Sequence, residues 1–312
     1  MPGADTSTKE KNFYTDIPAA KHSFFLKGLD QYDWGMQSRL SRMFNPKSGH
    51  TVMLAFDHGY AYGPTTGLER LDVTIAPLVP YADCLMCARG ALRSCIPSDC
   101  DKAVAMRCSA GTTILDENVF VNECIGVDIE EVIRMNVTCM AVQVCIGSDN
   151  ERNNIENFVK LVDLGNKYGI PVLGVTAVGK NMARDKRYFG LATRIIAELG
   201  GHLVKTYFVE DGFEDVAAGC PVPIVIAGGK KLPEKDALTM AYKAIQQGAS
   251  GVDMGRNVFQ SEDPIAMIQA IRSVVHDNAS PAQAYELFCD LKADNAKAAK
   301  TTKKSKTTKA KK

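Results

Sequence analysis

Apolar runs alternate with amphipathic stretches from about residue 50 to residue 277. Two of the amphipathic stretches, residues 153–168 and 233–248, repeat their apolar residues at helical spacing, and the second begins with proline and ends with glycine. Eight apolar runs have the length of buried strands. These are Val52–Phe56, Cys84–Ala88, Ala103–Arg107, Cys139–Val144, Val172–Thr176, Leu203–Thr206, Ile224–Ala227 and Gly251–Met254.

Eight strands, each followed by a helical stretch, predict a parallel (β/α)8 TIM barrel of the α/β class. An open, doubly wound sheet with two extra strands is the alternative. We place the barrel domain at residues 49–290, after an N-terminal extension (residues 1–48) and before a tail (residues 291–312). Because active sites of such barrels lie at the carboxyl ends of the strands, the residues after each strand are candidates for the site.

Charge is unevenly distributed along the chain. The net charge is +1, yet residues 291–312 contain nine lysines and one aspartate. From residue 297 onward no apolar side chain is larger than alanine, so this tail cannot bury a face. We expect it to be disordered and solvated, with at most weak attraction to polyanions. Neither nucleic acid nor a membrane is an expected partner.

Cysteine usage indicates a reducing compartment. The ten cysteines are scattered, and several lie within the apolar runs, where cysteine acts as a small apolar filler rather than as half of a disulfide. The N-terminus lacks the apolar core of a secretory signal, and no run reaches membrane-spanning length. We therefore expect a cytoplasmic protein. No His, Cys and carboxylate cluster has the spacing of a metal site, so no metal is expected.

Lys205 ends the apolar run that begins at Gly201. Desolvation at the end of a buried strand favours the neutral amine, and a neutral amine can attack a ketone to form a Schiff base. The alternative is a surface lysine that extends its ammonium group into water.

Two glycine-containing turns follow the last two strands. Gly228 and Gly229 come after the seventh, and Gly255 and Arg256 come after the eighth. Backbone N–H groups without an obstructing Cβ bind phosphate at this place in many barrels, and Arg256 can add a charged contact. A lysine nucleophile beside a phosphate site predicts carbon–carbon bond chemistry on a phosphorylated ketone.

Asp57 directly follows the first strand and shares one face of it with Met53 and Ala55. If that face is the barrel interior, Asp57 points into the mouth, where a carboxylate can move protons around an imine. The alternative is a loop or helix cap. A basic cluster at Lys180, Arg184, Lys186 and Arg187 follows the fifth strand, and it either faces an anionic ligand or is solvated.

Several blocks between about residues 24 and 290 resemble the archaeal-type class I aldolase family, of the DeoC/LacD type. Within it the resemblance is strongest to the thiolase branch, which acts in the breakdown of autoinducer-2. The blocks are Asp33–Arg42, Phe44–Lys47, Val52–Gly59, Gly63–Arg70, Lys205–Tyr207, Gly219–Lys231 and Gly248–Asn257.

The resemblance implies a Schiff-base lysine at Lys205 and a homo-oligomer, with a decamer as one expected size. It implies cleavage of 3-hydroxy-5-phosphonooxypentane-2,4-dione with transfer of acetyl to coenzyme A and release of dihydroxyacetone phosphate. Coenzyme A is then a co-substrate, and no cofactor is needed. Sugar-phosphate aldolases of this type place a tyrosine acid/base just after the fifth strand, where this chain has Ala177. That departure favours the thiolase.

Two other functions remain open from the sequence. One is a class I fructose-bisphosphate aldolase or a related sugar-phosphate aldolase, which would share the Schiff base and need no coenzyme A. The other is an inactive barrel that binds polyanions through its tail. A buried amine beside two phosphate-type turns disfavours this last alternative.

Overall fold

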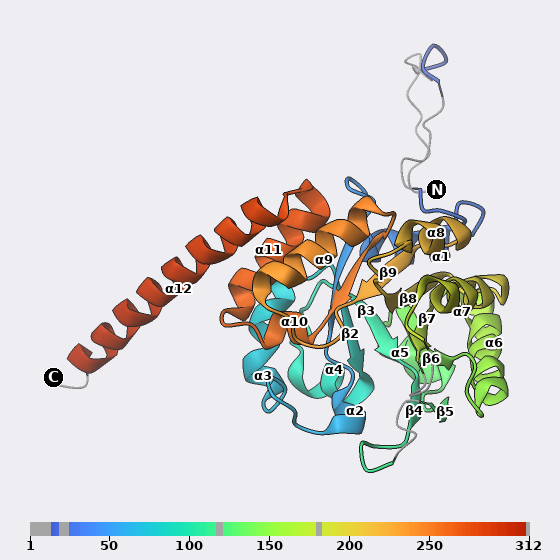
Figure 1. Ribbon diagram of the computed structural model, residues 1–312, viewed down its shortest axis with the longest axis horizontal. Coiled ribbons are helices and arrows are strands. Elements are labelled where there is room, and N and C mark those ends of the chain that lie inside the picture. Colours follow the sequence, from blue (N-terminus) through green and yellow to red (C-terminus); the bar gives the residue numbers. More distant parts are fainter. Residues whose placement is uncertain (1–13, 19–24, 117–120, 179–182, 310–312) are drawn as a thin grey trace, which may run out of the picture.

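A computed structural model describes residues 14–18, 25–116, 121–178 and 183–309 of the chain. Its centre is a closed barrel in the strand order β1-β10-β9-β8-β7-β6-β3-β2, with every pair of neighbours parallel (Figure 1). The strands are β1 (Thr51–Ala55), β2 (Cys84–Ala88), β3 (Ala103–Arg107), β6 (Cys139–Cys145), β7 (Val172–Ala177), β8 (Leu203–Tyr207), β9 (Ile224–Ala227) and β10 (Gly251–Met254). This confirms the predicted (β/α)8 barrel, and the open sheet was wrong.

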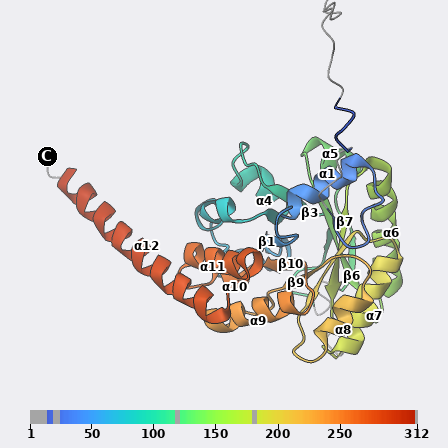
Figure 2. The same cartoon turned by 90° about the horizontal axis from the view of Figure 1, so that it is seen from above.

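Helices surround the barrel strands, as Figure 1 and Figure 2 show. In the helices Glu151–Tyr168 and Glu234–Gln246, the apolar residues at the predicted spacing are buried along one face. The helices are α1 (Trp34–Met43), α2 (Gly59–Tyr62), α3 (Leu71–Thr74), the 3₁₀ helix η1 (Ala76–Tyr81), α4 (Arg89–Cys95), α5 (Ile129–Arg134), α6 (Glu151–Tyr168), α7 (Lys186–Glu198), α8 (Phe213–Gly219), α9 (Glu234–Gln246), α10 (Arg256–Phe259), α11 (Pro264–Asp277) and α12 (Pro281–Lys309).

A small antiparallel hairpin, which the sequence analysis did not predict, interrupts the alternation after β3. Its strands are β4 (Ser109–Gly111) and β5 (Glu123–Ile125). Each is three residues long, too short for a periodic pattern to be recognised. The hairpin matters because β5 carries a carboxylate, Glu123, into the protein interior.

The N-terminal extension covers the end of the barrel opposite the predicted site. In α1, Met36, Leu40 and Met43 are buried. Arg39 donates a hydrogen bond of 3.0 Å to the carbonyl of Gly169, in the turn that precedes β7. The amino-terminal end of the barrel is thereby shielded from water, and the carboxyl ends of the strands are left as the accessible end.

The C-terminal helix α12 projects away from the barrel in both Figure 1 and Figure 2. It passes without interruption through the predicted boundary at residue 291. Lys292 forms an ion pair with Glu262, and Asn295 donates a hydrogen bond of 2.9 Å to Asp263. These contacts join the first residues of the predicted tail to the barrel, and the boundary at residue 291 stays a prediction. We still expect the rest of the tail to be disordered, because a helix without tertiary packing is only marginally stable in water.

No helix in the described ranges is long and apolar enough to cross a membrane.

Candidate active site

A cavity of about 880 Å³ opens at the carboxyl ends of the barrel strands. The residues predicted to act in catalysis or to bind phosphate all line it, although they come from four different strands or the turns that follow them. They are Asp57, Lys205, Gly228, Gly229, Gly255 and Arg256. The structure therefore confirms that these residues lie together, and their chemical roles remain predictions. Arg89, Ser109 and Gly147, which also follow strands, do not line the cavity.

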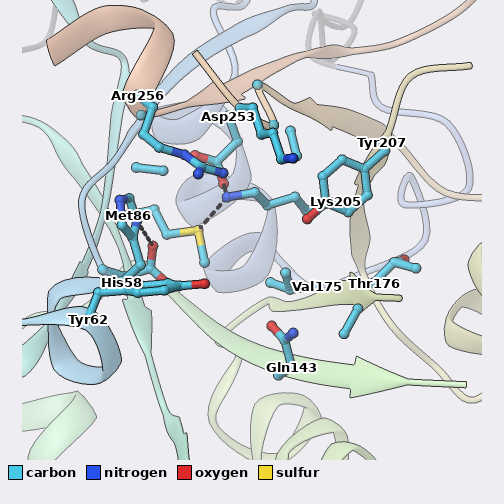
Figure 3. Close-up of a pocket in the computed structure, with 18 of the residues that line it drawn as sticks. His58, Tyr62, Met86, Gln143, Val175, Thr176, Lys205, Tyr207, Asp253 and Arg256 are labelled. Atoms are coloured by element: carbon cyan, nitrogen blue, oxygen red, sulfur yellow. Dashed lines mark hydrogen bonds and ion pairs between the residues drawn. The ribbon is translucent and has the colours of Figure 1, made fainter. Parts of the chain in front are cut away.

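Lys205 is buried on β8 and points into this cavity (Figure 3). Its Nζ lies 2.9 Å from Oδ2 of Asp253 on β10 and 3.4 Å from Sδ of Met86 on β2. The alternative of a solvent-exposed surface lysine is wrong, since the side chain is only 11% exposed. An amine in this position can be reached by a carbonyl compound only from within the cavity.

Asp253 is the acidic partner of Lys205, and the sequence analysis missed it. The side chain is fully buried, and the ion pair with Lys205 is its only close polar contact among the described residues. Burial raises the pKa of the Asp253 carboxyl, and the positive charge of Lys205 offsets this rise in part. A carboxylate with a raised pKa beside an amine can exchange a proton with it. The sequence feature that could have identified Asp253 is the presence of an aspartate within an otherwise apolar strand.

Asp57 also faces the cavity, but its strongest contact is with a cation other than Lys205. Its Oδ2 accepts a hydrogen bond of 3.0 Å from Nη1 of Arg107, and its Oδ1 lies 3.8 Å from Nδ1 of His58. Burial alone would raise the pKa of Asp57, but the nearby His58 side chain and the charges of Arg107 and Lys205 outweigh it and lower that pKa. Asp57 is therefore a carboxylate held in its charged form, and its predicted part in proton transfer stays a prediction.

Arg107, at the end of β3, is the centre of a buried polar network that the sequence analysis did not foresee. Its Nη2 donates to both carboxylate oxygens of Glu123, at 2.6 and 2.8 Å, and to Oε1 of Gln143 at 3.1 Å. The Tyr60 hydroxyl donates to Glu123 and accepts from Arg107. Ser109 donates a 2.5 Å hydrogen bond to Glu123. Arg107 and Gln143 also line the cavity, so the network forms part of its wall.

The two glycine turns lie side by side and are tied together by Asn257, another residue that was missed. Its Nδ2 donates to the carbonyl of Gly228 at 2.6 Å, and its Oδ1 accepts from the backbone N–H of Leu232 at 2.8 Å. Glycine is required at Gly255, because a Cβ there would lie 2.3 Å from the carbonyl oxygen of Ala55. Gly229 has a φ of +68°, which side chains rarely adopt. The turns thus expose backbone toward the cavity.

The basic cluster after β7 divides between cavity and solvent. Arg184 lines the cavity, and its guanidinium lies 4.7 Å from the ring centre of Tyr207. Lys186 is exposed and pairs with Asp215 at 3.1 Å, so it is solvated as the alternative proposed. Lys180 lies outside the described residues. Ala177 lines the cavity wall with a methyl group.

The family comparison agrees with this arrangement. The model of the DeoC/LacD family aldolase matches residues 51–261, which include every barrel strand and both glycine turns. The chain belongs to the DeoC/LacD aldolase family. The sequence similarity also includes most of the N-terminal extension, since a full-length relative aligns over 94% of this chain.

Several individual proteins are identical to this chain at more than half of the aligned positions. A 3-hydroxy-5-phosphonooxypentane-2,4-dione thiolase of Photorhabdus laumondii is 58% identical over 292 residues, which cover 94% of this chain and all of that protein. The thiolase of the same name from Salmonella typhimurium is 57% identical over the same length and coverage. An uncharacterized aldolase of Pasteurella multocida is 56% identical over 94% of this chain and all of its own.

Solved structures support the fold. An archaeal fructose 1,6-bisphosphate aldolase superposes with a TM-score of 0.69 at 22% identity, covering 78% of this chain and 99% of its own. A fructose-bisphosphate aldolase from Slackia heliotrinireducens gives a TM-score of 0.72 at 18% identity, covering 82% of this chain and 90% of its own. At these identities the superpositions establish a shared barrel and do not select a substrate.

Proposed function

We propose that this protein is a thiolase that cleaves 3-hydroxy-5-phosphonooxypentane-2,4-dione with coenzyme A, yielding acetyl-coenzyme A and dihydroxyacetone phosphate. The observation that carries the proposal is the buried pair of Lys205 and Asp253, which shares a cavity with both glycine turns. The names and high identity of the thiolases from Photorhabdus laumondii and Salmonella typhimurium support the substrate.

The strand order supports a definite orientation for this substrate. β8, which carries Lys205, has β9 and β10 with their glycine turns on one side and β7 and β6 on the other. With its phosphate on Gly228, Gly229, Gly255 and Arg256, the substrate presents the carbonyl next to its phosphate-bearing carbon to Lys205. Its acetyl end then extends toward β7 and β6.

The reaction begins when the neutral amine of Lys205 adds to that carbonyl. Loss of water leaves a protonated imine, and Asp253 exchanges the protons that this step requires. The thiolate of coenzyme A adds to the acetyl carbonyl and forms a carbon–sulfur bond. When that carbonyl re-forms, the adjacent carbon–carbon bond breaks, and its electron pair moves into the iminium to give an enamine. Protonation of the enamine carbon and hydrolysis release dihydroxyacetone phosphate and restore Lys205.

Dependence on coenzyme A tests the proposal directly. Purified protein incubated with the phosphorylated dione should form acetyl-coenzyme A and dihydroxyacetone phosphate, both detected by mass spectrometry, only when coenzyme A is added. Fructose 1,6-bisphosphate serves as the competing substrate. Cleavage of either compound at the same rate without coenzyme A would contradict a thiolase and favour an aldolase.

Replacing Arg256 by alanine should mainly raise KM for the phosphorylated dione. A phosphate contact holds the substrate equally in the ground and transition states, so its loss weakens binding without slowing the bound complex. A charge-assisted contact of this kind contributes roughly 1.5–3 kcal/mol, which predicts an increase in KM of about 10- to 100-fold. Steady-state kinetics at saturating coenzyme A measure it. An unchanged KM would show that the phosphate binds elsewhere in the cavity, and Arg184 would be the first residue to test.

We further propose a cytoplasmic homo-oligomer, and the family resemblance suggests a decamer. Large apolar side chains on the N-terminal extension support self-association, because Phe25 is 66% exposed and Trp34 is 79% exposed. Sedimentation velocity of the full chain measures the oligomeric state.

A further inference from the structure

The cavity carries more positive charge than one phosphorylated substrate can neutralise. Among the described residues, six cationic side chains and two carboxylates line it. The cationic side chains are Arg107, Arg184, Lys205, Lys230, Lys231 and Arg256, and the carboxylates are Asp57 and Asp253. A phosphate monoester brings at most about two negative charges at neutral pH. Binding of the dione therefore leaves the cavity positive, which favours a second anionic ligand.

Arg184 lies on the side of the cavity where coenzyme A must arrive. It follows β7, whereas Lys230, Lys231 and Arg256 follow β9 and β10. In the proposed orientation the phosphate of the dione occupies the turns after β9 and β10, and its acetyl end extends toward β7 and β6. Because the thiol has to reach this acetyl end, the rest of coenzyme A lies on the β7 side. Coenzyme A carries its phosphate groups far from the thiol, and Arg184 is exposed at the mouth of the cavity on that side.

The contacts around Arg184 hold its guanidinium at this place. The guanidinium lies 4.7 Å from the ring centre of Tyr207, which shares one face of β8 with Lys205 and is turned into the cavity with it (Figure 3). Asp185, the next residue, accepts a hydrogen bond of 2.8 Å from the backbone N–H of Tyr188. Within the ranges that the structure describes, no carboxylate pairs with Arg184. Its N–H groups are therefore available to an anion.

The wall between Arg184 and the acetyl end is apolar. Val175, Ala177 and Val178 line the cavity at the end of β7. The pantetheine arm of coenzyme A is long, flexible and uncharged, so it can lie along these side chains without leaving a charge unpaired. The cavity thus offers a cation for the phosphate end of coenzyme A and an apolar path for the arm that carries the thiol.

We propose that Arg184 binds a phosphate group of coenzyme A at the mouth of the cavity. This inference rests on the proposed thiolase function. A planar guanidinium donates two parallel hydrogen bonds to one phosphate group, and the Tyr207 ring keeps it oriented. The thiol then reaches the acetyl carbonyl along the β7 wall, while the phosphate of the dione stays on the glycine turns. Arg184 binds the co-substrate and takes no part in bond breaking.

Replacing Arg184 by glutamine should raise KM for coenzyme A by about 10- to 100-fold, the usual effect of losing a charge-assisted contact. At saturating coenzyme A, kcat should stay near wild type, because a remote phosphate is held equally in the ground and transition states. KM for the dione and borohydride trapping on Lys205 should also stay near wild type, and normal trapping shows that the variant is folded. Steady-state kinetics with each substrate varied in turn measure these values.

Pantetheine separates loss of a phosphate contact from a general disturbance of the site. It has the thiol and the arm of coenzyme A but no phosphate group. With pantetheine as the acetyl acceptor, kcat/KM should be the same in Arg184→Gln and in wild type. Arg187→Gln is the matched control, because Arg187 is another exposed arginine in the same segment and does not line the cavity. Its KM for coenzyme A should stay near wild type.

An unchanged KM for coenzyme A in Arg184→Gln would overturn the assignment. A rise in KM for the dione in its place would also overturn it, because Arg184 would then hold the phosphate of the dione. An equal loss with pantetheine, or an equal rise in Arg187→Gln, would show that the effect does not come from a phosphate on Arg184.

The wild-type protein separates this failure from failure of the proposed function. If wild type requires coenzyme A and Arg184→Gln has a normal KM for it, only the Arg184 assignment is wrong. If wild type cleaves the dione without coenzyme A, the thiolase itself is wrong.

Discussion

Lys205→Arg should abolish turnover, with a fall in kcat on the order of 10⁴-fold or more, because arginine cannot form an imine. The guanidinium stays protonated at every accessible pH. It also keeps a positive charge beside Asp253, so the buried carboxylate retains a partner. Removing the charge altogether would leave that carboxylate unpaired and risk unfolding, which makes arginine the more informative substitution.

Borohydride trapping measures the same loss independently of turnover. Reduction in the presence of the phosphorylated dione should attach the substrate to Lys205, and mass mapping should find no adduct in Lys205→Arg. Lys230 lines the same cavity and serves as the control, since Lys230→Arg should trap the substrate as wild type does. An adduct on Lys230 or Lys231 in place of Lys205 would contradict the assignment of the Schiff-base lysine.

Asp253→Asn should reduce kcat by about 10²- to 10⁴-fold, the usual contribution of a general acid–base group. Asparagine fills the same volume, but it cannot take a proton from the Lys205 ammonium group. Formation of the imine should therefore slow, and trapping with borohydride should slow in parallel. Stopped-flow or quenched trapping over time measures the rate of imine formation directly.

The same substitution should destabilise the protein, because it leaves the buried Lys205 amine without its counter-charge. Breaking one side of a buried ion pair costs about 3–5 kcal/mol, whereas removing both charges can be nearly neutral. Chemical denaturation should therefore show Lys205→Met/Asp253→Asn to be more stable than Asp253→Asn alone. If Asp253→Asn traps the substrate at the wild-type rate, Asp253 does not transfer the proton, and Asp57 becomes the candidate for that role.

The barrel and its secondary structure could be predicted because their signals are local. β3 begins and ends at the predicted residues, and β6 extends one residue beyond its prediction. Buried strands and amphipathic helices can be recognised from the spacing of apolar residues. The hairpin of β4 and β5 escaped prediction because three residues are too few to show such spacing.

The candidate site was only partly predictable. Lys205 and the glycine turns stand out in the sequence, because an amine at the end of an apolar strand and paired glycines are unusual locally. Glu123 and Gln143 do not stand out, because their importance comes from Arg107, which lies 16 and 36 residues away in the chain. Asp57 was identified correctly as facing the cavity, although its close partner is Arg107.

The sequence by itself determined the barrel, the strand ends that form the site and the lysine at its centre. Each of these depends on local periodicity or on a residue type that a buried strand rarely contains. Only the tertiary structure paired Lys205 with Asp253 and brought Gln143 into contact with Arg107. Those contacts depend on closure of the barrel and on the register of its strands, which bring side chains from distant parts of the chain into one cavity.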